Sequence, residues 1–201
     1  MLLEHADYNR LIAYYTESLK MHGPHSPKSL RWITAKDQRA RFRVLAHIGD
    51  LSGQTILDAG CGVGDFYGFL SGQTKNFTYL GVDAVPEMVE QARIKFPGVP
   101  FAAADMFAVQ DRYDYVFASG SLTFNVRGGK QFYYSLIKHL YGLAKNGLAF
   151  NMLDDSLFTT DETYLSYNPE EVAALSKSIT PNYKIITGYL SGDFTVYLYK
   201  P

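Results

Sequence analysis

Apolar residues along the chain gather in short runs separated by longer segments in which apolar and polar positions mix. Short apolar runs bounded by turn residues are typical of buried strands in parallel sheets, and the mixed segments are typical of helices packed on one face. The runs predict strands over Ile56–Asp58, Phe77–Val82, Val99–Ala103, Tyr113–Ala118 and Gly147–Leu153.

Helices are predicted before and between these strands. Proline is favoured in the first turn of a helix, and Asn168-Pro169 combines a capping residue with such a proline. Gly147 is predicted to end the helix that precedes the fifth strand. The predicted helices are Leu2–Lys20, Leu30–Ile48, Pro86–Phe96, Gly129–Ala144 and one that begins at Asn168.

The chain closes with two apolar segments, Tyr183–Leu190 and Phe194–Tyr199, separated by Ser191-Gly192-Asp193. This pattern predicts an antiparallel hairpin. Strands that alternate with helices and end in a hairpin indicate an α/β fold. We expect a doubly wound, Rossmann-like, mostly parallel seven-stranded sheet in a single domain over residues 1–201, with a helical N-terminal arm over 1–50 and a core over 54–201.

Candidate chemistry concentrates in Ile56–Leu70, which reads ILDAGCGVGDFYGFL. A strand ends near Asp58, glycines follow at positions 60, 62 and 64, and a helix opens at Asp65. Glycines adopt positive φ and let backbone N–H groups approach a ligand. A helix N-terminus adds partial positive charge. A strand, a glycine turn and a helix in this order predict a nucleotide-type binding turn.

Two carboxylates narrow the choice of nucleotide. In the dinucleotide fingerprint a glycine would stand at position 65, where this chain has Asp65. A carboxylate there disfavours a pyrophosphate and favours a cationic or zwitterionic ligand. Asp83 ends the second strand 23 residues after Gly60, close to the spacing at which an acidic residue binds ribose hydroxyls.

The segment Asp58-Ala59-Gly60-Cys61-Gly62-Val63-Gly64 resembles the first motif of class I S-adenosylmethionine (SAM)-dependent methyltransferases. The resemblance implies the cofactor SAM and the product S-adenosylhomocysteine. We expect a small-molecule methyl acceptor, because the sequence shows no appended recognition domain or basic face. It also implies that Asp105 accepts a hydrogen bond from the adenine amino group and that Met106 packs on the ring. The expected cofactor-binding residues are Arg41, Asp58, Gly60, Cys61, Gly62, Gly64, Asp83, Ala84, Asp105, Met106 and Ser119.

The N-terminal arm carries a further hypothesis. The stretch from Arg41 to Gly64 loosely resembles ubiquinone-type O-methyltransferases, in which an arginine at this place holds the methionine carboxylate of the cofactor. A guanidinium matches a carboxylate with two parallel hydrogen bonds. The resemblance therefore implies that the arm is a lid, with Trp32 packed inside it. Alternatively, the arginines of the arm simply solvate a helix face.

Aromatic residues are frequent and allow two interpretations. Tyr15, Trp32, Phe124 and Tyr164 are candidates for an acceptor pocket that also contacts the sulfonium. Alternatively, they only pack the arm and loops onto the sheet. His22 and His25 are candidates for a general base if the acceptor is a hydroxyl, and otherwise lie in a solvent-exposed loop.

Composition excludes several classes of function. The 201 residues carry a net charge of −1, which gives no basic surface for nucleic acid. The single cysteine, Cys61, allows no internal disulfide and is interpreted as a packing residue. No metal site is expected, although Asp154-Asp155 follows the fifth strand where catechol-type relatives bind magnesium. No stretch predicts a membrane span or a secretion signal, so we expect a cytoplasmic protein.

These patterns predict an enzyme that transfers a methyl group from SAM to a small molecule by in-line displacement. One alternative is a protein that binds SAM or S-adenosylhomocysteine without transfer, as a sensor or partner. The other is a nicotinamide oxidoreductase, which Asp65 and the closing hairpin disfavour. The sequence identifies neither the acceptor nor an oligomeric state.

Overall fold

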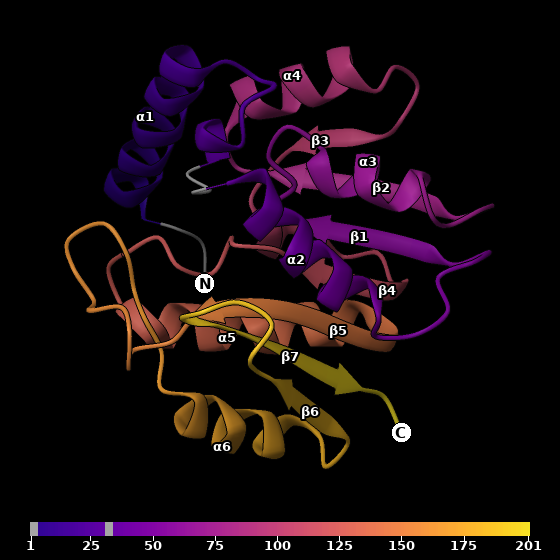
Figure 1. Cartoon of the computed structure of the whole chain (residues 1–201), viewed down its shortest axis with the longest axis vertical. Helices are drawn as coiled ribbons and strands as arrows, with labels where there is room; N and C mark the ends of the chain where they lie inside the picture. The colour runs from indigo at the N-terminus through magenta and orange to yellow at the C-terminus, as the bar shows by residue number, and fades with distance from the viewer. Residues whose placement is uncertain (1–3, 31–33) are drawn as a thin grey trace.

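A seven-stranded sheet forms the centre of the computed structural model, which describes residues 4–30 and 34–201 (Figure 1). The strand order is β3-β2-β1-β4-β5-β7-β6. Neighbours among β1 to β5 pair in parallel, whereas β7 runs antiparallel to both β5 and β6. This confirms the predicted fold. The strands are β1 (Thr55–Ala59), β2 (Thr78–Asp83), β3 (Phe101–Ala103), β4 (Tyr113–Ala118), β5 (Ala144–Leu153), β6 (Tyr183–Ile186) and β7 (Asp193–Tyr199).

Helices cover both faces of this sheet, as expected when successive side chains along a strand point to opposite faces. On β4, Val116 and Ala118 join the core beneath α5 and α6, whereas Phe117 joins the core beneath α2 and α3. The helices are α1 (His5–His22), α2 (Ala35–Ala46), α3 (Asp65–Ser71), α4 (Pro86–Lys95), α5 (Gly129–Leu143) and α6 (Pro169–Ile179), with short 3₁₀ turns η1 (Pro27–Leu30) and η2 (Met106–Ala108).

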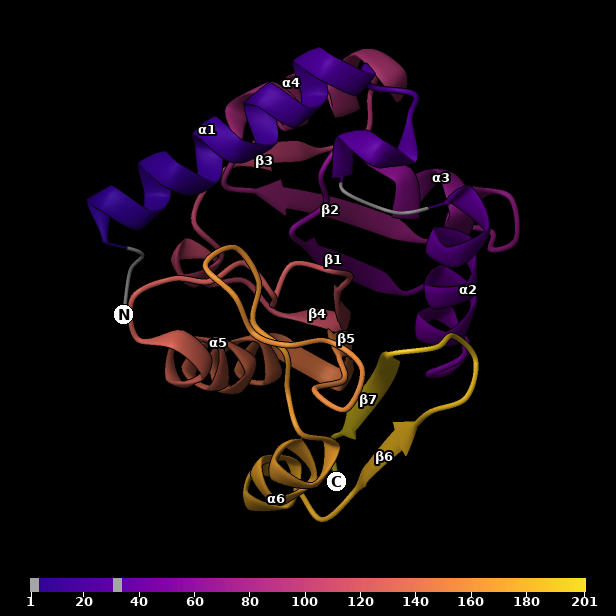
Figure 2. The same cartoon turned by 60° about the vertical axis from the view of Figure 1, so that its left-hand side comes forward.

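The arm lies over the carboxyl ends of the strands. Helix α1 packs along α4, and the two views agree on this placement (Figures 1 and 2). Leu19 of α1 is buried in a small cluster with Val63 of the glycine turn and with Val85 and Met88 at the start of α4. The arm therefore covers the edge of the sheet at which the predicted site residues lie.

The second arm helix begins later than predicted. Helix α2 starts at Ala35 rather than at Leu30, because Thr34 caps it by accepting a hydrogen bond from the backbone N–H of Asp37 at 3.1 Å. Residues 27–30 form η1 instead. Residues 31–33 lie outside the described residues, so the prediction that Trp32 packs inside the arm is untested.

Helix α5 continues into β5 without a connecting loop. The predicted stop at Gly147 is wrong, because β5 already starts at Ala144 and pairs there with Tyr113 of β4. Gly147 has a packing role instead. A Cβ atom at this glycine would lie 3.0 Å from Cδ1 of Ile48. The missing side chain lets the segment after α2 approach the sheet.

The closing hairpin forms as predicted, but its strands have different limits. Strand β6 ends at Ile186, four residues before the expected end. Asp193, expected in the turn, is the first residue of β7 and pairs with Leu153 of β5. This register places the Asp193 carboxylate at the same edge of the sheet as the glycine turn.

Candidate functional site

The glycine turn after β1 has the conformation that its sequence predicts. The φ angles of Gly60, Gly62 and Gly64 are +87°, +53° and +79°, a region that glycine adopts without strain. A Cβ at position 60 would lie 2.2 Å from Cβ of Ser121. The backbone N–H groups of Gly60 and Cys61 donate to the Val82 carbonyl at 2.7 and 3.1 Å. The turn is therefore held against the end of β2.

Asp83, the last residue of β2, fixes the same turn through its side chain. Its Oδ2 accepts a hydrogen bond from the Gly62 N–H at 2.8 Å, and its Oδ1 accepts one from the Val85 N–H at 2.9 Å. Burial raises the pKa of this carboxyl, and the backbone donors oppose that shift. Each carboxylate oxygen has a further lone pair for a ligand. The binding of ribose hydroxyls stays a prediction, to which the structure adds this scaffolding role.

Asp58 lies beneath the turn and is 1% exposed. Its Oδ2 accepts a hydrogen bond from the Tyr79 hydroxyl at 2.5 Å. Among the described residues its Oδ1 has no partner. Burial, opposed by the Tyr79 hydrogen bond and reinforced by the nearby carboxylates of Asp83 and Asp65, raises the Asp58 pKa to about 7.

The buried Asp58 predicts that stability falls as pH rises, which is the opposite of the usual effect of a carboxylate. Its carboxyl has a higher pKa when folded than when unfolded, so the folded state binds the extra proton between about pH 4 and pH 7. We expect the free energy of unfolding to fall by roughly 3 kcal/mol between pH 4.5 and pH 7.5. Urea denaturation at both values measures the fall. Asp58→Asn should remove most of it, and an equal fall in that variant would contradict the assignment.

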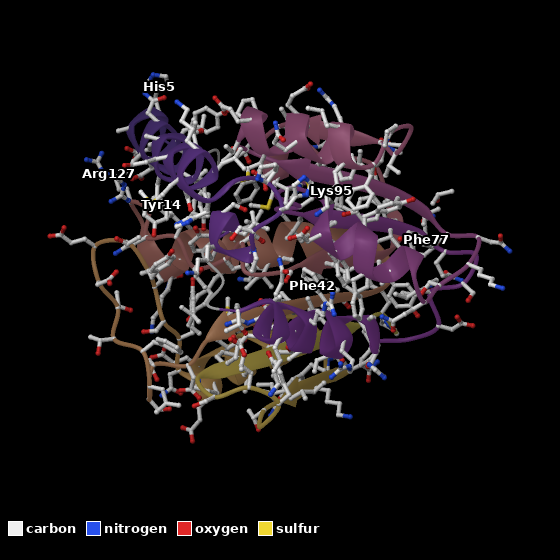
Figure 3. The ribbon with its side chains drawn as sticks, turned by 45° about the horizontal axis from the view of Figure 1, so that its top comes forward. His5, Tyr14, Phe42, Phe77, Lys95 and Arg127 are labelled. Carbon is white, nitrogen blue, oxygen red and sulfur yellow. The ribbon has the colours of Figure 1, made fainter. Side chains whose placement is uncertain are left out.

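The first residue of α3, Asp65, joins three helices. Gln38 of α2 donates to its Oδ2 through Nε2 at 2.9 Å, and the Lys95 ammonium of α4 contacts its Oδ1. Phe42, which Figure 3 labels on α2, packs on Phe66 of α3 with ring centroids 5.2 Å apart. Asp65, whose carboxylate disfavours a pyrophosphate at this position, therefore also anchors the arm to the glycine turn.

Two adjoining cavities open at this edge of the sheet. The smaller, about 80 Å³, is lined by the glycine turn at Gly60 and Gly62, and by Asp83. The larger, about 290 Å³, lies between α2, the end of β5 and the loops before α6 and β7. Three residues line both cavities, namely Tyr15, Leu30 and Gly120.

The structure brings most of the predicted residues to these cavities. Of the residues predicted to bind the cofactor, Gly60, Gly62, Asp83, Ala84, Met106 and Ser119 line the smaller cavity. Of the residues predicted to bind the acceptor, Phe124 lines the smaller cavity, Tyr164 the larger and Tyr15 both. The three rings lie together with Tyr14, whose hydroxyl is 2.8 Å from that of Tyr164.

Other predicted residues line neither cavity. Gly64 caps α3 and faces the ring of Phe101. The Cys61 side chain is buried in the core, which raises the pKa of its thiol and agrees with a packing role. Asp105 caps η2 by accepting from the Phe107 N–H at 2.8 Å. Within the described residues neither cavity is lined by His22 or His25.

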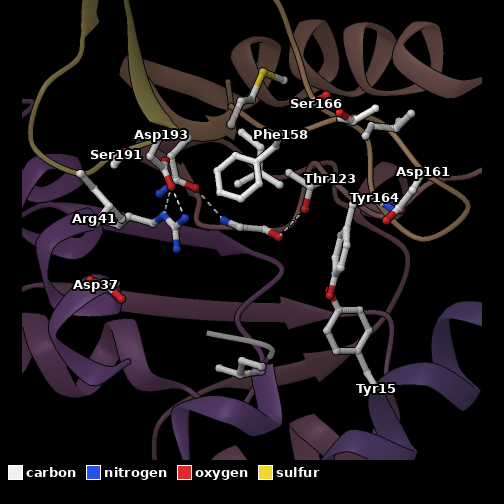
Figure 4. A pocket seen from close by; sticks show the side chains of 18 residues that line it. Tyr15, Asp37, Arg41, Thr123, Phe158, Asp161, Tyr164, Ser166, Ser191 and Asp193 are labelled. Carbon is white, nitrogen blue, oxygen red and sulfur yellow. Dashed lines mark hydrogen bonds and ion pairs between the residues drawn. The ribbon is translucent and has the colours of Figure 1, made fainter. Parts of the chain in front are cut away.

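Arg41 has a protein partner that the sequence did not suggest. Its guanidinium forms an ion pair with Asp193, whose side chain is 1% exposed, at the wall of the larger cavity (Figure 4). Arg41 does not line the smaller cavity. Its predicted contact with the cofactor carboxylate stays a prediction, and the structure gives the guanidinium a role in joining α2 to β7.

Sequence reasoning missed Asn151 and Asp193, which both line the larger cavity. Asn151 was detectable, since it is a polar residue inside the apolar run of β5. Asp193 was not, because an aspartate between Gly192 and a predicted strand is typical of an ordinary turn. In the described part of the chain, no three His, Cys, Asp or Glu residues gather as metal ligands would. No described helix is long and apolar enough to span a membrane.

Comparison with known proteins gives one consistent result. The family model described as a methyltransferase domain matches residues 56–142. A trans-aconitate 2-methyltransferase of Enterobacter sp. (strain 638) is 34% identical over 125 residues, which are 60% of this chain and 48% of that protein. A putative methyltransferase of Invertebrate iridescent virus 6 is 25% identical over 117 residues, 57% and 42% of the two chains. The chain spans about half the length of the curated relatives it matches.

Solved structures show the same fold at low identity. Magnesium protoporphyrin IX methyltransferase from Synechocystis PCC 6803, determined with bound SAM, superposes with a TM-score of 0.72 at 17% identity, covering 97% of each chain. The DhpI–S-adenosylhomocysteine complex superposes with a TM-score of 0.71 at 16% identity, covering 96% of this chain and 97% of that one. The glycine turn and the sheet order therefore lie in a chain whose residues 56–142 match the methyltransferase domain and whose fold is shared with SAM-bound methyltransferases.

Proposed function

We propose that the chain binds SAM against the glycine turn and transfers its methyl group to a small molecule in the larger cavity. The observation that carries the proposal is the contact between the two cavities through Tyr15, Leu30 and Gly120. A donor held in one cavity and an acceptor held in the other would face each other across these three residues.

The residues of the smaller cavity suit this cofactor. SAM supplies a methyl group on a positively charged sulfur. Transfer of that methyl group leaves the sulfur as a neutral thioether. Gly60 and Gly62 present backbone rather than side chains to the cavity, and Asp83 offers carboxylate lone pairs where a ribose would lie. Tyr15 and Phe124 present aromatic faces, which attract a sulfonium.

The contribution of the chain to catalysis is then alignment and exclusion of water. Leu11 and Tyr15 of α1 and Leu30 of η1 cover the smaller cavity from the arm side. This supports the hypothesis that the arm acts as a lid. Names of relatives and neighbours, which include trans-aconitate and magnesium protoporphyrin IX as acceptors, support a small-molecule acceptor here.

Calorimetry on the purified chain tests the proposal. We expect SAM and S-adenosylhomocysteine to bind with micromolar dissociation constants, which correspond to a binding free energy of about 8 kcal/mol in magnitude. We expect no binding of NAD. Asp83→Ala should weaken SAM binding by about 2–4 kcal/mol, because it leaves ribose hydroxyls unpaired and releases the Gly62 and Val85 N–H groups. Asp83→Asn should retain part of the affinity.

A matched control is Asp50→Ala. It also removes a carboxylate that accepts from a backbone N–H, that of Ser52 at 2.9 Å, but Asp50 lines neither cavity. It should leave SAM affinity unchanged. Binding of NAD without either SAM species would refute the proposal. Binding of SAM without conversion to S-adenosylhomocysteine, across a library of small-molecule acceptors, would favour a non-transferring sensor.

A further inference from the structure

Asn151 near the end of β5 has an unusual hydrogen-bonding state. Its side chain is 2% exposed and lines the larger cavity. Its Oδ1 accepts a hydrogen bond from the Gly120 N–H at 2.8 Å. Within the described chain its Nδ2 has no partner. A buried donor without a partner is unfavourable by about 1–3 kcal/mol and requires an explanation.

The contact with Gly120 fixes which way the amide faces. A backbone N–H can only donate, so the oxygen of the amide must be the atom beside it. The NH₂ group therefore occupies the other position, and only an acceptor can satisfy it. Because Asn151 lines the larger cavity, a molecule in that cavity can supply this acceptor. Gly120 also lines the smaller cavity, so such a molecule would lie beside the cofactor site.

Charges around the larger cavity restrict that molecule further. The charged side chains that line it, among the described residues, are Asp37, Arg41, Asp161 and Asp193. Arg41 and Asp193 are paired with each other. Asp161 accepts from two backbone N–H groups, which lower its pKa and keep it ionised. The remaining charge of the wall is negative, which disfavours an anionic acceptor.

The rest of the wall is largely apolar. Tyr15 and Tyr164 lie together on the side of the cavity opposite Arg41, and Phe158 lies between Arg41 and these two tyrosines (Figure 4). Leu153, Leu165 and Leu190 complete the apolar surface. Flat aromatic and branched aliphatic walls suit an apolar body with few polar groups.

We propose that the larger cavity takes an uncharged, mainly apolar acceptor whose carbonyl-type oxygen accepts a hydrogen bond from Asn151 Nδ2. This inference rests on the proposed function and names the substrate class of the same site. It separates the chain from its trans-aconitate relatives, whose named substrate is a carboxylate. Asn151 thereby becomes a specificity-determining residue for the acceptor.

Two matched probes test the inference, 2-naphthamide and 2-naphthoate, which share one flat body and differ in charge and donor–acceptor pattern. Their affinities are measured by calorimetry on the protein saturated with S-adenosylhomocysteine. We expect the amide to bind at least about fivefold more tightly than the carboxylate. Asn151→Asp keeps an oxygen for the Gly120 N–H but replaces the donor with an acceptor, and it should weaken amide binding at least about fivefold.

Asn146→Asp is the matched control, since Asn146 lies on the same strand and is exposed. It should leave amide binding unchanged. Equal or tighter binding of 2-naphthoate, no binding of 2-naphthamide, or an unchanged affinity in Asn151→Asp would overturn the inference. A separate titration with S-adenosylhomocysteine alone distinguishes this failure from that of the proposed function: binding in that titration keeps the cofactor site while the proposed class of acceptor is overturned.

Discussion

Arg41→Ala is expected to lower the free energy of unfolding by about 3–5 kcal/mol at neutral pH. The Asp193 side chain is 1% exposed, and its ion pair with the guanidinium joins α2 to the first residue of β7. Removing the arginine leaves a carboxylate buried without its counter-charge. Urea denaturation of the variant and the wild type at equal pH measures the loss.

Two controls separate the ion pair from its surroundings. Arg43→Ala removes an exposed arginine of the same helix and should change the free energy of unfolding by less than about 0.5 kcal/mol. Arg41→Met combined with Asp193→Leu replaces both charges with apolar groups and should recover most of the loss. A loss below about 1 kcal/mol in Arg41→Ala would show that the pair is not structural. The SAM affinity of Arg41→Ala tests the separate prediction that Arg41 contacts the cofactor carboxylate.

Gly60→Ala is expected to weaken SAM binding at least about 100-fold, or roughly 2.7 kcal/mol. The φ angle of +87° is unfavourable for alanine. The added Cβ would also lie 2.2 Å from the Cβ of Ser121, whose Oγ donates to the Ala59 carbonyl at 2.8 Å. The turn and the Ser121 loop must therefore separate. Calorimetry with SAM measures the loss of affinity.

The chain offers a control for backbone strain alone. Gly98 has a φ angle of +84°, and a Cβ there would meet no atom within 4 Å. Gly98→Ala should cost about 1–2 kcal/mol of stability without changing SAM affinity. Ser121→Gly in the background of Gly60→Ala removes the clashing atom and should restore part of the binding. Full SAM affinity in Gly60→Ala would mean that the cofactor lies elsewhere.

Elements with strong local signals were predictable from the sequence. Strand β4 has the predicted limits, Tyr113–Ala118, because an apolar run between turn residues leaves little choice. Helix α6 is capped by Asn168 as expected, with Oδ1 accepting from the N–H groups of Glu170 and Glu171. The α5–β5 junction was mispredicted, because sheet pairing at Ala144 outweighs the glycine three residues later.

The part of the site that lies within one motif was also predictable. Gly60, Gly62 and Asp83 reach the smaller cavity because the strand–turn–helix order brings them there. The larger cavity depends on contacts between residues far apart in the chain. Arg41 and Asp193 are 152 positions apart, and nothing near either residue indicates the other. Such pairs follow from the folded sheet, not from local spacing.

The contacts between α2 and β7 also bear on how the chain folds. Arg41 binds Asp193, and the Tyr197 hydroxyl donates to the Val44 carbonyl, so two anchors of α2 come from residues 152 and 153 positions further along the chain. Contacts of this separation close a long loop, which is slow compared with local folding. We therefore expect the wall between α2 and β7 to form after the local helices, and disruption of β7 to loosen α2 as well.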